Sequence, residues 1–393
     1  MKAFLCLLGL LSLTAANAQT DFKLTGDALV RGYFKNSTGS SGEQAFNQFF
    51  RLNLTAKPDD ALTAKVGAVL TSSSWEGDNH KSIPNNGAAI SGVHSNTNSE
   101  VVRLDHATLE YKINSWIVSA GRHQVSTPGY FLTSDDRRDR IQVLNIRPNY
   151  DVLAFAYDKR AEGNLTNGHD DLDMYSVNYY GQLNPNFKYA LQTAYWVSKK
   201  FDNTTSGQNS INLDEIKQVS PQINANIKGV NLDFYYTLLF GGSTLYTKDH
   251  HSFAFKLSKE IESYKLEYQS MLTIRGGLIA SGFDSLSSIV NNSPDKLQSS
   301  IKVKTIGFGL GLINKKESLH MLRFSKQILP KLRASIGGGY GEFVNLFGKD
   351  DVYLADATAT YDISTFLKLE FAYGKMFDEL KDHAGSLTLK ANF

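Results

Sequence analysis

The chain has 393 residues, enough for two soluble domains or one large barrel, and its 41 Lys and Arg nearly balance its 39 Asp and Glu. No polybasic tract occurs, which argues against nucleic acid as a partner. No run after the N-terminal segment approaches 18 apolar residues, so a membrane helix is not expected, whereas a β-barrel escapes this test because only alternate residues of its strands contact lipid.

The N-terminus has the pattern of a secretory signal peptide. Lys2 precedes an apolar run at 3–13, and small residues close on Ala16, Asn17 and Ala18. We therefore expect cleavage after residue 18, with 19–393 forming the mature protein. Cys6, the only cysteine, lies inside the signal peptide. The mature chain would then have no disulfide and would depend on packing and backbone hydrogen bonds.

The first strong alternation lies at 22–34, where apolar and small residues take the even positions and Lys23, Asp27 and Arg31 take odd ones. A period of two over 13 residues is typical of a tilted membrane strand. Further strand-like runs follow at 50–57, 62–70, 101–113, 116–124, 139–147, 150–160, 172–183, 187–199, 214–227, 230–240, 252–259, 264–274, 301–313, 319–328, 332–341, 352–363, 366–377 and 385–393.

The connectors come in two sizes that largely alternate, as in an up-and-down barrel. Short ones lie at 58–60, 114–115, 148–149, 184–186 and 228–229, and long polar ones at 72–100, 125–138, 200–213 and 275–300. The runs number 19, whereas a bacterial single-chain barrel has an even number of strands, so one assignment is wrong. We place the error between 275 and 300, where a poorly patterned strand at 278–290 is one explanation. At about 20 residues per strand, the length predicts roughly 16 to 20 strands, with about 18 as the central value.

A soluble all-β fold, such as a propeller or a β-helix, is the structural alternative. Such folds show a repeat of fixed period, and none is found here. Their packed strands are apolar on both faces, whereas these runs carry charge on the second face. Aromatic residues near strand ends, such as Phe22, Trp116 and Phe131, are expected to form the two interfacial girdles. We therefore predict an all-β, transmembrane, up-and-down antiparallel barrel.

The C-terminal residues Leu387, Leu389, Ala391 and Phe393 form an alternating strand with an aromatic last residue. This ending resembles the assembly signal by which the barrel-assembly machinery recognises outer-membrane proteins. Together with the signal peptide it predicts a protein of the Gram-negative outer membrane, surrounded by lipid, with its C-terminus on the periplasmic side.

The stretch 103–140 resembles the OprD type of substrate-specific bacterial porins. The matching residues are Ala107, Tyr111, Lys112, Gly121, Arg122, Gln124, Thr127, Pro128, Asp135, Asp136, Arg137 and Arg138. The resemblance implies an 18-stranded barrel whose third outer loop, at 125–138, folds into the lumen and narrows it. It also implies a porin: a water-filled channel for passive diffusion of small hydrophilic solutes and ions, with neither catalysis nor a cofactor.

Charges that line a pore set its selectivity, so the charged residues carry the expected function. The candidate constriction is Asp135, Asp136, Arg137, Arg138, Asp139 and Arg140. Facing acids and bases there would set a transverse field that orients dipolar solutes. A basic wall opposite the constriction is expected from Arg31, Arg51, Lys65, Arg103 and Arg122. The simpler interpretation is a solvated outer loop whose charges pair among themselves and contribute little individually.

Catalysis and metal binding have weaker support. No nucleophile and base stand at the fixed spacing of a hydrolase, and the acid and His clusters at 169–171 and 249–251 also suit turns. Asp170, Asp171 and Asp173 could hold Ca²⁺, but without an EF-hand pattern an acidic turn is the better interpretation.

Two further questions stay open at this level. A plugged structural or adhesive barrel would use 72–100 and 275–300 as contact surfaces, although their Ser, Asn and Gly suit solvated segments better. Both a homotrimer and a monomer are compatible with the sequence. The small-residue face of a trimer could come from Gly307, Gly309, Gly311, Gly337, Gly338 and Gly339, but glycine also serves strand curvature.

Overall fold

The computed structural model describes residues 20–37, 42–74, 102–149, 151–161, 172–198, 215–243, 246–280, 283–290, 301–304, 306, 316–345, 348–377 and 381–393. Its strands are β1 (Asp21–Asn36), β2 (Glu43–Lys57), β3 (Leu62–Ser74), β4 (Arg103–Ile113), β5 (Trp116–Val125), β6 (Asp136–Ile146), β7 (Val152–Ala161), β8 (Leu172–Asn184), β9 (Phe187–Ser198), β10 (Lys217–Ile227), β11 (Val230–Phe240), β12 (His250–Ile261), β13 (Tyr264–Ile274), β14 (Glu317–Leu329), β15 (Leu332–Asn345), β16 (Gly348–Asp362), β17 (Leu367–Phe377) and β18 (His383–Asn392). A short 3-10 helix, η2 (Pro128–Tyr130), follows β5. Among the described residues, no helix has the length and hydropathy needed to cross a bilayer.

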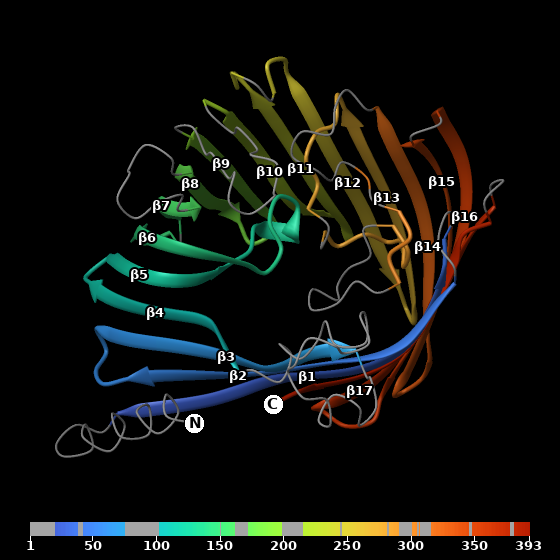
Figure 1. Cartoon of the computed structure of the whole chain (residues 1–393), viewed down its shortest axis with the longest axis horizontal. Coiled ribbons are helices and arrows are strands. Elements are labelled where there is room, and N and C mark those ends of the chain that lie inside the picture. The colour runs from blue at the N-terminus through green and yellow to red at the C-terminus, as the bar shows by residue number, and fades with distance from the viewer. Residues whose placement is uncertain are drawn as a thin grey trace, which may run out of the picture.

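The 18 strands form one closed antiparallel sheet (Figure 1). Each strand pairs with its neighbours in sequence, and β1 also pairs with β18, which closes the barrel. Short turns connect β4 to β5, β10 to β11 and the other even-to-odd pairs at one end. The predicted up-and-down barrel and its central strand count are confirmed.

Alternation along each strand separates an inner and an outer face, as β1 illustrates. Leu24 on the outer face is 63% exposed, whereas the inward Leu29 and Arg31 are buried. The same contrast holds for β16, where Tyr353 is exposed and its neighbour Leu354 is buried. The exposed apolar side chains would face lipid, because an apolar outer surface is favourable in lipid and unfavourable in water.

The surplus predicted strand is 301–313. Residues 301–304 and 306 contain only an isolated bridge between Val290 and Lys304, and 307–313 lie outside the described residues. The hidden strand at 278–290 was also wrong: its described residues form a non-strand segment that packs against the inner face of β12–β16. The alternation at 301–313 therefore added one strand too many, and the described residues between β13 and 301 contain no strand.

Eighteen strands about 4.8 Å apart and tilted by about 40° give a barrel roughly 36 Å across. Side chains alone cannot fill such a lumen, unlike that of an eight-stranded barrel. Two connections fold inward (Figure 1). One is the β5–β6 loop, residues 126–135. The other is the β13–β14 segment, of which 275–280, 283–290, 301–304 and 306 are described.

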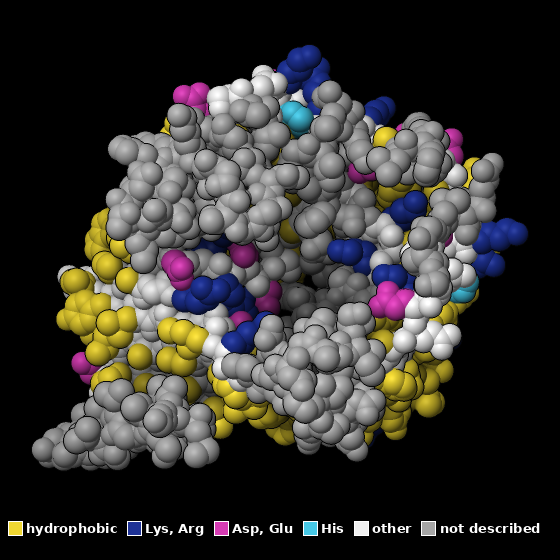
Figure 2. All heavy atoms as spheres, viewed as in Figure 1, with side chains coloured by type: hydrophobic (Ala, Val, Ile, Leu, Met, Phe, Trp, Pro, Cys, Tyr) yellow, Lys and Arg dark blue, Asp and Glu magenta, His cyan; other side chains and the backbone are white. Residues whose placement is uncertain are grey.

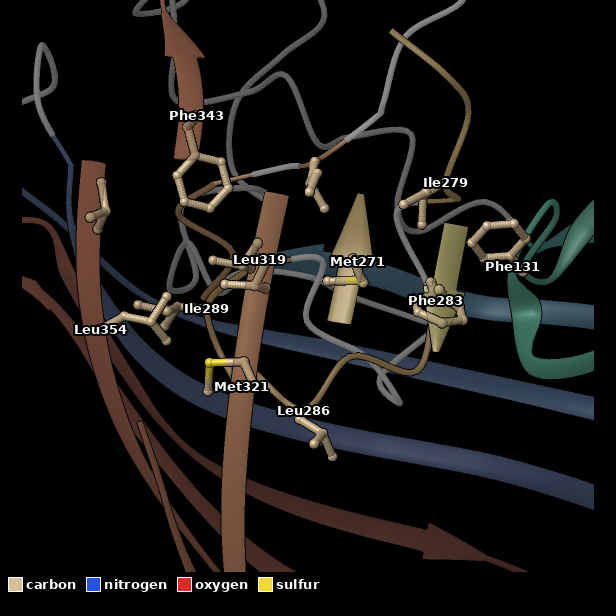
Figure 3. Close-up of a cluster of buried hydrophobic side chains, with 14 of the residues drawn as sticks. Phe131, Met271, Ile279, Phe283, Leu286, Ile289, Leu319, Met321, Phe343 and Leu354 are labelled. Carbon is tan, nitrogen blue, oxygen red and sulfur yellow. The ribbon is translucent and has the colours of Figure 1, made fainter. Parts of the chain in front are cut away.

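A large buried cluster lies between these connections and the inner face of β11–β16 (Figure 3). The β13–β14 segment contributes Ile279, Phe283, Leu286, Ile289 and Val290, and the facing wall contributes Met271, Leu319, Met321, Val352 and Leu354. The inner face here is apolar because protein covers it, which differs from the polar inner face expected throughout.

Glycines on β15 and β17 make this close packing possible. A Cβ on Gly339 would lie 2.2 Å from the Met321 sulfur, and one on Gly337 would lie 2.6 Å from Asp356. A Cβ on Gly374 would lie 2.8 Å from Ile289 in the β13–β14 segment. Gly337 and Gly339 therefore point into the barrel and cannot form the outer trimer face considered above. Gly307, Gly309 and Gly311 lie outside the described residues.

Candidate pore wall

The predicted charge cluster lies mainly on the barrel wall. β6 begins at Asp136, so of the six candidates only Asp135 belongs to the β5–β6 loop. The six side chains do not share one face. Asp139 is exposed on the outer face, in register with Arg122 of β5, and the two side chains pair at 3.7 Å. Asp139 and Arg122 therefore point away from the lumen, because the register of β5 and β6 gives both of them the same side as the exposed Ile141.

An acid-rich network joins β1, β2, β4, the β5–β6 loop and the start of β6. Arg51 forks onto Asp27 through Nε and Nη2 at 3.0 and 2.8 Å, and its Nη1 lies 3.3 Å from Asp105. Arg137 forks onto the same Asp105 at 2.8 and 2.6 Å. Asp135 accepts from both arginines, at 3.5 and 2.9 Å. Three aspartates thus hold two arginines.

A base-rich network lies beside it on β6 and β7. Asp158 is fully buried and accepts from Arg138 at 3.2 Å and from Arg140 at 2.8 Å. Asp136 pairs with Arg138 at 2.9 Å and with Arg160 at 2.8 Å. Three arginines thus hold two aspartates, and the two networks together balance. Bidentate geometry makes such pairs strong as well as directional.

The expected basic wall is only partly present. Arg51 contacts Asp135 directly and so belongs to the same network rather than standing opposite it. Lys65 pairs with Glu110 at 2.8 Å on the inner face of β3 and β4. Arg31 is buried and donates to Thr388, while Arg103 at the start of β4 shares the inner side with Val69. These candidate charges form one patch around β1–β7. A second set of inner charges lies on β12–β16, where Lys256 pairs with Glu267 and Arg323 pairs with Asp356.

The wall around β8–β11 is polar but largely uncharged. Its buried inner side chains hydrogen-bond to one another: Gln222 to Gln192 at 3.3 Å, and Ser220 to Thr237 at 2.8 Å. Figure 2 shows basic and acidic side chains gathered around the central hollow, with hydrophobic side chains on the outside. The inner face is thus charged around β1–β7, lined by amides and hydroxyls around β8–β11, and carries further ion pairs on β12–β16.

The two inward connections interlock. Phe131 of the β5–β6 loop, Tyr235 of β11 and Phe283 form an aromatic trio with ring centroids 5.3 to 5.7 Å apart. The Ala280 amide donates to the Phe131 carbonyl at 2.8 Å. Gly129, at φ +62°, lets the loop press on β11, because a Cβ there would lie 2.3 Å from the Tyr235 hydroxyl. Phe131 is therefore internal and does not belong to an interfacial girdle.

Polar contacts fix the β13–β14 segment to the wall. Gln269 donates to the Asp284 carbonyl at 2.9 Å and accepts from the Leu286 amide at 2.8 Å. Asp356 accepts from the Ser288 amide at 2.7 Å and is held by Arg323 at 2.8 Å. Sequence reasoning missed this inner segment. The available signal was a recurrence of apolar residues at 279, 283, 286 and 289 within a connector.

The remaining candidates have ordinary surroundings where they are described. Asp173 lies on β8, accepts from the Tyr157 hydroxyl at 2.9 Å and pairs with Lys159 at 3.7 Å. Asp170, Asp171 and the signal peptide lie outside the described residues. Within the described ranges, no cluster of His, Cys, Asp or Glu is arranged to hold a metal. Phe393 forms backbone hydrogen bonds with Gly26 at 2.7 and 3.1 Å, next to the seam between β1 and β18.

The fold is that of outer-membrane porin barrels. The structure of a BenF-like porin from Pseudomonas fluorescens Pf-5 is similar, with a TM-score of 0.64, 11% identity, and coverage of 95% of this chain and 98% of the other. OccK3 (OpdO) of Pseudomonas aeruginosa gives a TM-score of 0.63 at 10% identity, covering 95% and 96%. OccAB3 of Acinetobacter baumannii gives 0.62 at 11% identity, covering 95% and 99%. No protein-family model and no curated protein matches the sequence.

Proposed function

We propose that this protein is a porin of the bacterial outer membrane that lets small hydrophilic solutes and ions diffuse through its lumen. The observation that carries the proposal is the closed 18-stranded barrel with a charged patch on the inner face of β1–β7. Burial of five arginines and five aspartates away from water would cost much free energy even though they are paired, so we infer that this lumen contains water. The similar fold of known porins supports the same function.

The channel is narrowed from one side by the β5–β6 loop and the β13–β14 segment. Their apolar packing occupies the β11–β16 side, which leaves the charged patch to border the passage. Passive diffusion needs no chemistry from these residues, and we propose neither catalysis nor a cofactor. Assembly through the aromatic C-terminus at Phe393, after removal of residues 1–18, belongs to the same proposal.

The accessible members of the two networks would act on passing solutes. Asp136 and Arg160 keep about a third of their side-chain surface exposed, at 34% and 28%, whereas Asp158 is fully buried. Because acids and bases are balanced and adjacent, the patch is a local dipole along the wall. We expect weak ion preference and a better passage for dipolar solutes than for apolar ones.

Planar-bilayer recording and liposome swelling test the function. The purified chain should give stepwise conductance and should let small sugars swell liposomes. A barrel that gives neither steps nor swelling would be plugged, and the proposal would be wrong. Stepwise closure in threes would indicate a trimer, and single steps a monomer.

The role of the charged patch is tested by reversal potentials across a KCl gradient. Arg160→Gln should shift preference toward cations and Asp136→Asn toward anions, because each removes one accessible charge. Asp139→Asn, on the outer face, is the matched control and should have no effect. Equal reversal potentials in all four proteins would contradict a pore-lining role.

A further inference from the structure

A shallow groove lies on the outer face of the barrel across six adjacent strands, β6–β11. One register row crosses it through Ile141, Tyr157, Tyr175, Tyr195, Lys217 and Phe240. The next row includes Val143, Phe155, Val177, Thr193 and Val219. The groove has a volume of about 650 Å³ and an almost wholly apolar lining. It faces the surroundings of the barrel and is separate from the lumen.

A row of alternating charge borders the groove on the long-loop side. Arg122, Asp139, Lys159 and Asp173 are in register on β5, β6, β7 and β8. They pair two by two, Arg122 with Asp139 and Lys159 with Asp173, each at 3.7 Å. Lys217 adds a third cation within the groove row.

The position of this row fixes the level of the lipid headgroups. A cation on the lipid-facing surface costs about 2–4 kcal/mol at the bilayer midplane but about 0–1 kcal/mol near the interface. Four charges in register therefore mark the end of the hydrocarbon band. The short turns lie at the opposite end of the strands, so this is the outer leaflet in the orientation of the proposed porin.

The dimensions of the groove select the kind of lipid. Six strands about 4.8 Å apart span roughly 24 Å, which accommodates several acyl chains side by side. Two cations at the rim, on β5 and β7, and Lys217 of β10 in the adjacent row then suit a headgroup with more than one phosphate. A lipid with two chains and one phosphate would leave part of the groove and of the rim unused.

We propose that the outer face of β5–β11 is a binding site for an anionic, multiply acylated glycolipid of the outer leaflet. Its acyl chains lie on the aromatic and aliphatic side chains of the two groove rows, such as Tyr175 and Val177, and its phosphates contact Arg122, Lys159 and Lys217. Asp139 and Asp173 hold two of these cations extended at the rim. The inference rests on the outer-membrane location given under the proposed function.

Native mass spectrometry of the full mature chain in detergent tests the site. The probes are a hexa-acylated bisphosphorylated glucosamine disaccharide, its dephosphorylated form and phosphatidylglycerol. The bisphosphorylated glycolipid should bind best. The triple variant Arg122→Gln, Lys159→Gln, Lys217→Gln should bind it about a hundredfold more weakly, at roughly fivefold for each cation near a headgroup. Tyr175→Ala should weaken the binding of all three lipids.

Lys375→Gln is the matched control. Lys375 lies on the outer face near the long-loop end of β17, 5.5 Å from the Phe377 ring, on another part of the circumference. Equal binding by the wild type and the triple variant would overturn the proposal, and so would preference for phosphatidylglycerol. Dimers or trimers that dissociate on Tyr175→Ala would show instead that the face joins copies of the chain. Conductance of the same samples tests the porin separately, and the triple variant should keep it.

Discussion

Phe283→Ala should open the passage without unfolding the barrel. Phe283 is buried in the β13–β14 segment and forms both ring contacts that join this segment to the β5–β6 loop and to β11. Truncation of a buried Phe costs about 3–5 kcal/mol. The strand ladders do not depend on this side chain, so the loss falls on docking of the segment. At about 1.4 kcal/mol per factor of ten, docking would weaken by roughly two to three orders of magnitude.

Single-channel recording in planar bilayers measures the effect. The variant should have a larger mean conductance and more frequent transitions between levels, and liposomes should admit larger sugars than with the wild type. Phe371→Ala is the matched control, because it removes the same ring from the exposed outer face of β17. If Phe283→Ala and wild type give the same conductance and noise, the segment does not narrow the passage and the reasoning fails.

Three further predictions concern other parts of the structure. Gly374→Val should displace the β13–β14 segment and raise conductance. Gly338→Val should not, because a Cβ there would have its nearest neighbour, the Leu354 carbonyl oxygen, 3.8 Å away. Equal conductance of the two variants would contradict close packing at β17. Asp158→Asn leaves buried arginines without their carboxylate and should destabilise the protein by about 3–5 kcal/mol in urea unfolding; a loss below about 0.5 kcal/mol, typical of surface sites, would refute this. The Tyr179 hydroxyl donates to Asp151 and lowers the pKa of that carboxyl, so its stabilisation is present near neutral pH and is lost as pH falls below the usual value of about 3.9. Asp151→Asn should therefore lose less stability than wild type between neutral pH and pH 3, and equal losses would be evidence against this contact.

The barrel could be predicted because its signal is local and repeated. Alternation in each strand reports which side chains face lipid, and turn residues mark the strand ends. Both depend on neighbours in sequence, so β1, β11 and β18 were found close to their observed bounds. The exception was 301–313, where alternation of small and apolar residues is not accompanied by a strand in the described part.

The candidate wall was predicted less well, because sidedness and pairing depend on register between strands. Arg122 was assigned to the lumen by counting along the chain, but its register with Asp139 gives it the outer face. Arg51 was expected to stand opposite Asp135, yet the inward course of the loop brings the two into contact. The β13–β14 segment was overlooked because its apolar residues, spaced as on a helix face at 279, 283, 286 and 290, lie in a connector whose described residues form no helix. Their role follows only from their packing against β12–β16.

The seam between β1 and β18 sets a condition on biogenesis. Asp27 to Asn36 pair with the last strand, and Arg31 donates to Thr388, 357 positions later. The first strand to be translated therefore receives its second partner only when the last one has been made. Until then the sheet has two open edges, and in hydrocarbon each unpaired backbone group costs several kcal/mol. A chain that lacks its final ten residues cannot close as a slightly smaller barrel, because β18 is the strand that pairs with both β1 and β17. Closure of the barrel therefore has to follow completion of translation.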